Sequence, residues 1–436
     1  MKPSLSPEDL ASCGKEMHAL CTNLFPICRS LTGNGVRQTL GVLQQHIPQL
    51  SIYEIPTGTK AFDWAVPDEW NIRDAYVIAP DGKKVIDFKD SNLHVVGYST
   101  PVERRIDLEE LQEHLHSLPD LPDAIPYVTS YYTRRWGFCL TQRQRDGLKP
   151  GVYEVKIDST LAPGHLTYAD ALLPGDEKNE VLLSTYVCHP SLANNELSGP
   201  AVATLLAKHI SGWKKRRYSY RFVFVPETIG AIAYISRNLE HLKKRVCAGF
   251  QITCVGDDHC YSYLPTRNGD TLSDRVAKHV LKHTDPAYKS YSFLDRGSDE
   301  RQYCAPGVDL PIATVMRSKY GAYPEYHTSL DDLSFVSPTG LSGSFQALLR
   351  CVLALEHAQA YKANFLCEPQ MGKRGLYSTL GTRSVSDAVR MRMDLLAYCD
   401  GSRDLVEIAD LLGVPIWEAT PYVEELKSHG LISELG

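Results

Sequence analysis

The sequence of 436 residues is 43% hydrophobic and 22% charged, and its 46 basic and 52 acidic side chains give a net charge of -6. This composition is typical of a globular protein with about two or three domains, and it lacks the polybasic run expected of a nucleic-acid binder. No apolar stretch reaches the roughly 18–20 residues of a membrane-spanning helix, and the first residues lack the apolar core of a signal peptide, so we expect a cytoplasmic protein that does not span a membrane.

The first part of the chain has the pattern of helices and the next part that of strands. Apolar residues at helical spacing predict two helices within residues 7–48, with a break at residues 30–35. From Ile52 to about Val155, short runs such as DAYVIA and YEVKI alternate with Pro, Gly and Asn or Asp turns. We therefore expect residues 1–51 to supply helices of a larger domain, and residues 52–155 to form an inserted, mostly β domain.

The middle of the chain alternates strands and helices. Apolar runs predict strands at 181–187, 220–225, 248–255 and 311–318, and helical patterns cover about 199–210, 271–283 and 339–362, with another helix beginning near Ile229. This alternation is typical of an α/β layer built on a mixed, largely parallel sheet flanked by helices. We expect residues 156–367 to complete that domain.

Residues 376–436 are expected to form a separate unit that resembles a winged helix-turn-helix. This segment holds ten acidic residues against five Lys or Arg, a net charge of -5, whereas a module that enters a DNA groove should be basic. Nucleic acid is therefore an unlikely partner. A packing or dimerisation role is the better expectation, and it leaves room for a homo-oligomer.

Polar residues that directly follow apolar strands are the first candidates for chemistry, because ligands bind outside the carboxyl ends of strands in such sheets. His189 and Glu196 follow the strand at 181–187, Glu227 follows the strand at 220–225, and His327 lies in a later polar loop. One histidine at a strand end is more often structural than functional. Two histidines and two carboxylates around one sheet edge could assemble a zinc site.

At these residues the chain resembles the zinc aminopeptidase superfamily, which includes bacterial leucyl aminopeptidases and glutaminyl cyclases. The matching segments, in order over about residues 160–360, are His189, NELSG from Asn195, ETIG from Glu227, TCVG from Thr253, SDE from Ser298, and His327 with Thr328. More closely, strings such as CHPSLANNELSGP, GSDERQYC and YPEYHTSLDD resemble aminopeptidase-like proteins with an inserted β domain and a C-terminal winged helix. The resemblance implies that Glu227 is the general base.

Three departures from the superfamily pattern bear on the metal. Asn195, Thr228 and Thr253 stand where the superfamily carries anionic metal ligands. Two zinc ions about 3.5 Å apart need bridging and terminal anions, which neutral side chains cannot supply. We therefore expect one zinc ion held by His189, Glu196 and His327. For Glu227, the alternative to a catalytic base is a carboxylate favoured by the dipole of the following helix.

Further polar residues lie in the segments around this site and could contact a substrate. An arginine there would bind a carboxylate, and an Asp or Glu would bind an amine, although each is also explicable as half of a structural ion pair. Tyr131, Tyr132 and Trp136 could line a pocket, but they could equally belong to the core of the β domain. The candidate substrate contacts are Arg267, Asp299, Arg301, Arg317 and Glu325.

These observations favour a zinc-dependent hydrolase of an amide or peptide bond in a small aminoacyl or modified amino-acid substrate, with one metal ion and Glu227 as general base. The alternative is an inactive aminopeptidase-like protein that binds partners or serves as a scaffold. Placement separates the two hypotheses: the hydrolase requires His189, Glu196, Glu227 and His327 to converge, and it fails if His189 and His327 lie apart.

Overall fold

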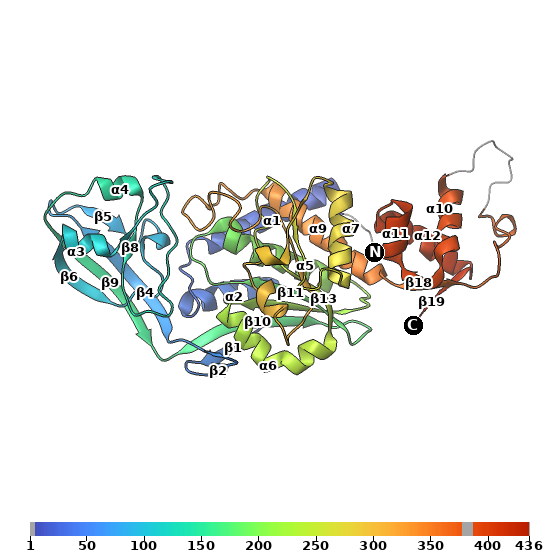
Figure 1. The fold of residues 1–436 in the computed structure, drawn as a ribbon, viewed down its shortest axis with the longest axis horizontal. Coiled ribbons are helices and arrows are strands. Elements are labelled where there is room, and N and C mark those ends of the chain that lie inside the picture. Colours follow the sequence, from blue (N-terminus) through green and yellow to red (C-terminus); the bar gives the residue numbers. More distant parts are fainter. Residues whose placement is uncertain (1–4, 377–386, 436) are drawn as a thin grey trace.

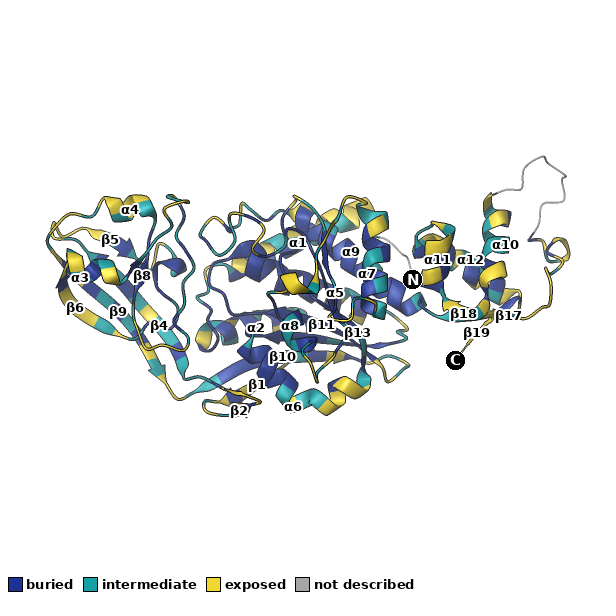
Figure 2. Ribbon diagram, viewed as in Figure 1, coloured by how far each residue is buried: buried dark blue, intermediate teal, exposed yellow. Residues whose placement is uncertain are grey.

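The computed structural model describes residues 5–376 and 387–435, so residues 1–4, 377–386 and 436 of the expected ranges 1–51 and 376–436 lie outside the described residues. The molecule is elongated (Figure 1). An α/β domain occupies the centre, the inserted β domain lies at one end and the winged helix lies at the other. Buried residues lie in all three parts (Figure 2), and the apolar core of the winged helix is continuous with one core of the central domain.

The central domain is built on an eight-stranded mixed sheet with the order β1-β10-β12-β11-β13-β16-β14-β15. The four strands β12, β11, β13 and β16 are parallel neighbours, and antiparallel pairs extend the sheet on both sides. The expected mixed, largely parallel sheet is thus confirmed. The strands are β1 (Ser51–Pro56), β10 (His165–Leu173), β11 (Glu180–Tyr186), β12 (Ser219–Val225), β13 (Val246–Gln251), β14 (Ser262–Leu264), β15 (Lys289–Ser290) and β16 (Ile312–Met316).

Helices cover both faces of this sheet. Successive strand residues point to opposite faces, so Val181 and Leu183 of β11 pack in one core while Leu182 packs in the other. The first core contains α1, α2, α5, α7 and α9, and the second contains α6 (Figure 1). The helices are α1 (Pro7–Leu24), α2 (Asn34–His46), α5 (Ser198–Ser211), α6 (Ile229–Arg245), α7 (Leu272–Thr284), α8 (Glu300–Tyr303) and α9 (Pro338–His357), with short turns η2 (Ala193–Leu197) and η3 (Phe293–Asp295).

The inserted domain follows β1 and returns to the large sheet through β10. Its four-stranded antiparallel sheet has the order β5-β4-β9-β6 and its own apolar core. Its elements are β2 (Lys60–Ala61), β3 (Trp64–Ala65), β4 (Glu69–Ile78), β5 (Lys84–Asp87), η1 (Asn92–His94), β6 (Val102–Asp107), α3 (Leu108–Glu113), β7 (Leu115–His116), β8 (Phe138–Cys139), α4 (Gln142–Asp146) and β9 (Val152–Ala162).

The extent of the insertion differs from the expected range 52–155 at both ends. β1 pairs with β10 from Ser51 to Pro56 and therefore lies in the large sheet. At the other end, β9 continues in the inserted sheet as far as Ala162. The reason is that β1 alternates like any antiparallel strand, and its partner is more than a hundred residues away in sequence.

The C-terminal unit is a winged helix that begins directly after α9. The expected helix at 339–362 ends at His357, and Ala360–Ala363 form β17, which pairs with both β18 and β19. Residues 360–363 therefore join the winged helix rather than the α/β domain expected to reach residue 367. The remaining elements are η4 (Gly372–Arg374), α10 (Asp387–Tyr398), β18 (Asp400–Asp404), α11 (Leu405–Leu412), α12 (Ile416–Ser428) and β19 (Ile432–Glu434).

The winged helix packs on α7 and α9 through a shared apolar core and through polar contacts. Buried His279 of α7 faces Asp410 of α11, with Nδ1 3.0 Å from Oδ1, and its Nε2 accepts a hydrogen bond of 2.9 Å from the backbone N–H of Ile416. The guanidinium of Arg350 lies 4.4 Å from the centre of the Trp417 ring. The start of α12 is therefore fixed against the α/β domain. In the part of the chain that the structure describes, no helix is long and apolar enough to cross a membrane.

Candidate active site

Two neighbouring parallel strands deliver the central residues of the site. β11 and β12 are paired up to Tyr186 and Val225, so the segments that follow them leave the same edge of the sheet. His189 follows β11, and Glu227 follows β12. The Nε2 atom of His189 lies 3.4 Å from Oε2 of Glu227, whose side chain is 19% exposed and therefore reachable by solvent. The placement expected from the sheet topology thus holds for these two side chains.

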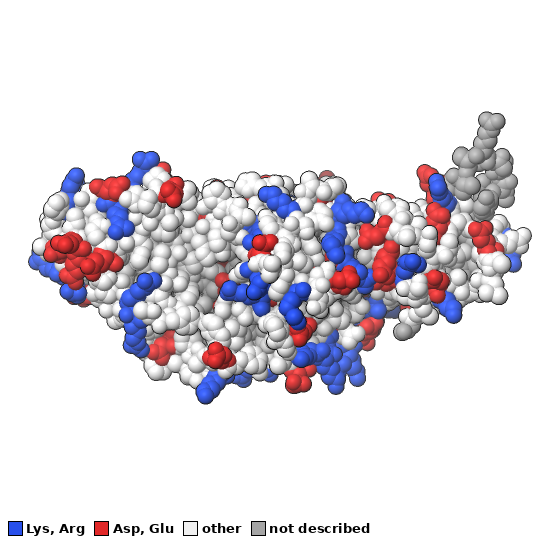
Figure 3. Space-filling view, viewed as in Figure 1, with Lys and Arg blue, Asp and Glu red and all other residues white. Residues whose placement is uncertain are grey.

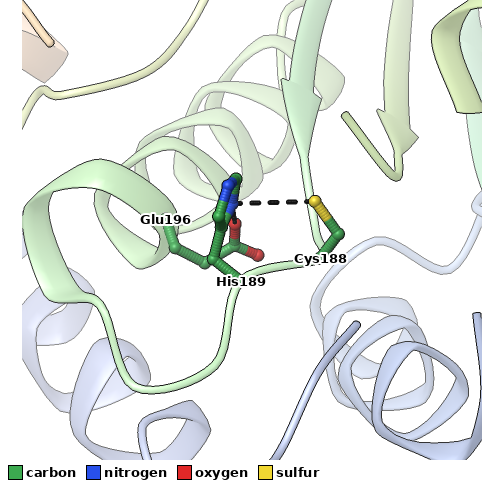
Figure 4. A group of neighbouring side chains, drawn as sticks. All are labelled: Cys188, His189 and Glu196. Atoms are coloured by element: carbon green, nitrogen blue, oxygen red, sulfur yellow. Dashed lines mark hydrogen bonds and ion pairs between the residues drawn. The ribbon is translucent and has the colours of Figure 1, made fainter. Parts of the chain in front are cut away.

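The other ring nitrogen of His189 is held by Glu196. The Nδ1 atom lies 2.7 Å from Oε2 of Glu196, and Sγ of Cys188 lies 3.6 Å from the same nitrogen (Figure 4). Burial lowers the pKa of His189, but the thiol of Cys188, the phenol of Tyr127 and the carboxylate of Glu196 outweigh it and hold this pKa well above its ordinary value. The carboxylate of Glu196, which we expected as a zinc ligand with His189 and His327, instead binds Nδ1 of His189 and orients the imidazole.

Arg29 is buried behind this pair. Its Nε lies 3.5 Å from Oε1 of Glu196 and donates a hydrogen bond of 2.9 Å to the backbone oxygen of His189. A second bond of 2.8 Å runs from Nη1 to the backbone oxygen of Leu24, at the end of α1. The buried carboxylate of Glu196 thus has a buried cation beside it, which offsets the cost of removing both charges from water.

Asp331 fixes the turn η2 that carries Glu196. Its carboxylate accepts hydrogen bonds from the backbone N–H groups of Asn194, at 2.6 Å, and Asn195, at 2.9 Å. Burial raises the pKa of Asp331 to about 7, and these N–H donors counteract part of that rise. The turn is therefore anchored from the loop that follows His327.

His327 lies across the pocket from His189. Their ring centres are 5.5 Å apart, and the Tyr127 ring meets both edge-on, at 5.2 Å from His189 and 5.1 Å from His327. Tyr326 stacks on His327 at 3.9 Å. The Nε2 atom of His327 is buried without a hydrogen-bond partner, and burial together with the nearby His189 lowers its pKa to about 3. His327 therefore presents a neutral imidazole nitrogen.

The inserted domain holds the His327 loop in place. The backbone N–H of Tyr127 donates to the oxygen of His327 at 2.8 Å, and Pro126 and Thr328 form a β-bridge. Ser329 contributes two more bonds, because its N–H donates to the oxygen of Ile125 at 2.8 Å and its hydroxyl accepts from the N–H of Ile125 at 2.9 Å. One wall of the site thus belongs to the insertion.

The three neutral residues at expected anion positions are tied up with other partners. The Tyr186 hydroxyl lies 2.5 Å from the hydroxyl of Thr253 and accepts a hydrogen bond of 2.6 Å from Nδ2 of Asn195. The hydroxyl of Thr228 accepts a bond of 2.7 Å from Nη2 of Arg301. The phenol of Tyr186 and the guanidinium of Arg301 therefore lie where a second metal ion would need carboxylate ligands.

Asp299 lies beside Thr228. Its Oδ1 accepts a hydrogen bond of 2.8 Å from the N–H of Thr228, whereas its Oδ2 is buried without a partner. Burial and the neighbouring Glu227 raise the pKa of Asp299 well above its ordinary value, although Arg301 acts in the opposite direction. Asp299 and Arg301 therefore belong to the surroundings of the site, as the sequence predicted.

The other three expected substrate contacts have other surroundings. Arg267 pairs with Asp309 and donates to the backbone oxygen of Cys304 at 3.0 Å, at a different depression of the surface. Arg317 donates to the oxygen of Asp257 at 2.7 Å and covers the ring of Tyr261. Both are structural in these positions. Glu325 keeps Oε2 buried without a partner, but it does not line the pocket.

The pocket has a volume of about 360 Å³ and contains both histidines. Four aromatic side chains of the insertion form one wall, and the hydroxyls of Tyr127 and Tyr131 lie 2.6 Å apart. Tyr131 and Tyr132 thus line the pocket, whereas Trp136 packs in the core of the inserted domain. The lining residues are Leu31, Trp64, Tyr127, Thr129, Tyr131, Tyr132, Cys188, His189, Glu227, Thr228, Arg301 and His327.

A zinc ion could approach either ring nitrogen of His189. Cys188, His189 and Glu196 place ligand atoms within 4.8 Å of one another. On that side, however, Arg29 already supplies the cation, and burial raises the pKa of the Cys188 thiol to about 11. On the Nε2 side, His327 lines the same pocket as His189 with an unpartnered ring nitrogen, and imidazole nitrogens are ligands that zinc prefers.

Comparison with solved structures identifies the fold as that of zinc aminopeptidases. A zinc aminopeptidase of Bacillus subtilis has a TM-score of 0.57 at 11% identity, with 78% of this chain and 95% of that chain covered. An aminopeptidase of Aneurinibacillus sp. strain AM-1 has a TM-score of 0.51 at 13% identity, with 80% and 96% covered. The fold expected from the sequence motifs is confirmed.

The chain belongs to the family described as a domain of unknown function, DUF4910, whose model matches residues 18–358. A winged helix-turn-helix model matches residues 359–434, which confirms the C-terminal unit. A Clostridium acetobutylicum protein, named as a candidate polysaccharide biosynthesis protein with an aminopeptidase-like domain, is 46% identical over 404 residues, 92% of both chains. A C. acetobutylicum crystal structure described as a candidate peptidase has a TM-score of 0.92 at 43% identity, with 98% of each chain covered.

Proposed function

We propose that this protein is a zinc-dependent hydrolase that cleaves an amide or peptide bond in a small aminoacyl or modified amino-acid substrate. The observation that carries the proposal is the convergence of three side chains in one pocket. His189 and His327 lie with ring centres 5.5 Å apart, and Glu227 lies 3.4 Å from Nε2 of His189. The aminopeptidase-like fold and the order of the motifs support the same reaction class.

One zinc ion held by His189 and His327 would polarise the substrate carbonyl and lower the pKa of a water molecule. Glu196 and Arg29 hold the His189 ring so that Nε2 faces the pocket. Tyr127 packs against both imidazoles and keeps bulk water from their edges. The chain's own contribution is thus a pair of fixed imidazoles in a partly closed cavity.

Glu227 transfers the proton in the proposed reaction. Its carboxylate takes a proton from water as the water oxygen bonds to the amide carbon, and it passes that proton to the nitrogen as the carbon–nitrogen bond breaks. An amide and one water are thereby converted into a carboxylic acid and an amine. The solvent-accessible edge of Glu227 lets it exchange protons between turnovers.

A single zinc ion suits the charges of the site better than two. Tyr186, Asn195 and Thr253 are linked by hydrogen bonds and carry no charge, and Arg301 adds a positive charge at Thr228. A second cation would meet this positive charge without the carboxylates that offset metal–metal repulsion. We therefore propose one zinc ion.

The substrate is small in this proposal. A cavity of about 360 Å³ lies at the lower end of the usual range for small-molecule sites, about 300–1,000 Å³. The name of the C. acetobutylicum relative includes polysaccharide biosynthesis. This name supports an amide carried on a sugar as one substrate to test, since the aromatic wall offers flat surfaces to a ring.

The winged helix serves as a packing unit in this proposal. The N-terminal end of α12, the helix that would enter a DNA groove, is bonded to His279 of the α/β domain. On the face drawn in Figure 3, acidic and basic side chains are interspersed over the C-terminal unit and form no basic stripe. These features favour intramolecular packing or contact with a second copy over DNA binding.

Zinc-loaded protein incubated with aminoacyl anilides and N-acyl amino sugars tests the proposal, with products followed by mass spectrometry. Wild-type protein should release an acid and an amine, and Glu227→Gln should reduce the rate by about 10²–10⁴-fold. Glu240→Gln, the same change at an exposed position of α6, should leave the rate unchanged. Absence of turnover with every amide would favour the inactive binding protein instead.

A further inference from the structure

Arg301 places a positive charge at the pocket without an acidic partner. It follows Asp299 in the short helix α8, and its guanidinium lines the pocket. Nη2 donates to the neutral hydroxyl of Thr228 at 2.7 Å, and Nε is buried without any acceptor. Among the described residues, Arg301 forms no ion pair.

Two other arginines of the central domain have carboxylates beside them. Arg29 has Glu196 beside it, and Arg267 has Asp309. Removing a guanidinium from water without a counter-charge costs several kcal/mol, so protein interiors pair such groups or reserve them for a ligand. Arg301 lines the pocket and has no acid within ion-pair distance among the described residues, which fits the second case.

The residues around Arg301 keep its guanidinium aimed at the pocket. Thr228 has φ 63° and ψ -85°, a left-handed conformation that costs a non-glycine residue about 1–3 kcal/mol. In this conformation its hydroxyl receives Arg301, while its N–H donates to Asp299. Asp299 is thus engaged with the backbone and makes no ion pair with Arg301.

The opposite wall of the pocket is aromatic. Trp64, Tyr127, Tyr131 and Tyr132 all come from the inserted domain, and Tyr132 is 66% exposed. Tyr132 meets Trp64 edge-on at 5.6 Å and Tyr131 at 6.4 Å. The pocket therefore combines a cationic end, a pair of imidazoles and a wall for an apolar or ring-shaped body.

We propose that Arg301 binds a carboxylate of the substrate, so that the substrate class is a small amide carrying a carboxylate on a body packed against the aromatic wall. A planar guanidinium with a free N–H matches a carboxylate and discriminates against its neutral isostere. This inference rests on the proposed function, because that function places the scissile amide beside His189 and Glu227.

Two hydroxamates that differ in one group test this inference. The first probe, succinic monohydroxamic acid, carries a terminal carboxylate. The second probe has a neutral amide in place of that carboxylate. Each is titrated calorimetrically into zinc-loaded protein. Wild-type protein should bind the acid about 10–100-fold more tightly than the amide. Arg301→Met should bring that ratio to about 1, and Arg301→Lys should restore part of it. Arg296→Met, an exposed arginine five residues earlier, should leave the ratio unchanged.

The possible results separate the two proposals. If the amide binds wild-type protein as tightly as the acid does, the carboxylate assignment is overturned while the hydrolase remains. If Arg301→Met weakens both probes equally at unchanged circular dichroism, Arg301 acts on the structure of the pocket, and the assignment also fails. If neither hydroxamate binds to wild-type protein, the metal-dependent function itself is contradicted.

Discussion

The imidazole of His189 is bound by Glu196 through Nδ1, at 2.7 Å, while Arg29 binds both that carboxylate and the backbone oxygen of His189. Two residues, Glu196 and Arg29, thus fix the side chain and main chain of His189. Because Nδ1 is engaged, Nε2 is the nitrogen that faces Glu227 and the pocket. The same relationship makes Glu196 an orienting residue in this structure.

Removal of Arg29 should destabilise the protein strongly. Arg29→Met leaves the fully buried carboxylate of Glu196 without its cation, and breaking a buried pair in this way costs about 3–5 kcal/mol. Urea unfolding followed by circular dichroism measures the change. Arg73→Met, which breaks the exposed pair with Asp158, is the control and should leave the unfolding midpoint almost unchanged. Equal midpoints for both variants would contradict the role of Arg29.

Glu227→Gln distinguishes a general base from a metal ligand. The amide keeps the shape of the side chain but cannot accept a proton, so a base variant should retain its zinc while losing about 10²–10⁴-fold in rate. Zinc content and turnover are measured on the same preparation. Loss of the zinc together with the activity would assign Glu227 to the metal.

The hydrogen-bonded group of Tyr186, Asn195 and Thr253 should contribute to stability. Tyr186→Phe removes the hydroxyl that accepts from Asn195 and contacts Thr253, and it leaves buried polar groups without partners. We expect a loss of about 1–3 kcal/mol in urea unfolding and an unchanged zinc content. Uptake of a second zinc ion by this variant would show that the hydroxyl alone excludes it.

Docking of the winged helix should weaken as the pH falls. Burial lowers the pKa of His279 below 6.5, against the opposing effect of Asp410, and Lys282 also acts to lower it. Because the unfolded state then binds the proton more readily, the contribution of His279 is complete above about pH 6.5 and decreases as the pH falls below it. Protonation also removes the acceptor for the N–H of Ile416.

Limited proteolysis between pH 7.5 and 5.5 measures this docking. The wild-type protein should be cut between its domains faster at low pH, and His279→Gln, which keeps a donor and an acceptor, should be less sensitive to pH. His429→Gln, at an exposed position of the winged helix, serves as the control and should behave as wild type. His283 and Trp417 face the same interface as His279. If the wild type, His279→Gln and His429→Gln were equally sensitive to pH, the effect would not come from His279.

Local patterns in the sequence were sufficient for the four parallel strands β11, β12, β13 and β16 of the central sheet and for His189 and Glu227 at their carboxyl edge. His189 and Glu227 could be predicted together because both follow apolar strands, and adjacent parallel strands end at the same edge. His327 could be named from the superfamily motif. Its approach to His189 depends on Tyr127 and the inserted domain, which no local pattern encodes.

Residues that act through long-range contacts could not be found in this way. Arg29 follows the first helix and reaches Glu196 across more than 160 positions, and Asp331 reaches Asn194 across more than 130. A lone arginine or aspartate in a loop carries no periodic signal. Tyr127 lies four residues before Tyr131, a candidate pocket residue from the sequence, and this proximity was a local hint.

The domain boundaries that differ from the prediction involve strands whose partners are distant in sequence. β1 joins the large sheet through β10, and β17 joins the winged helix through β18 and β19. The same alternating residues would suit either sheet, so only the pairing decides the domain to which a short strand belongs. The structural roles of Arg267 and Arg317 could not be predicted for the same reason. Arg267 pairs with a distant acid and Arg317 with a distant backbone carbonyl, and only these partners show that both are structural.

The metal content of protein purified without chelator tests the central claim most directly. Elemental analysis of the wild type, with zinc offered at neutral pH, should give about one zinc per chain, and the His189→Ala/His327→Ala double variant should lose it. Circular dichroism verifies that the double variant is folded. A wild-type protein without zinc, or a double variant that keeps the same zinc content, would contradict a metal site between the two imidazoles.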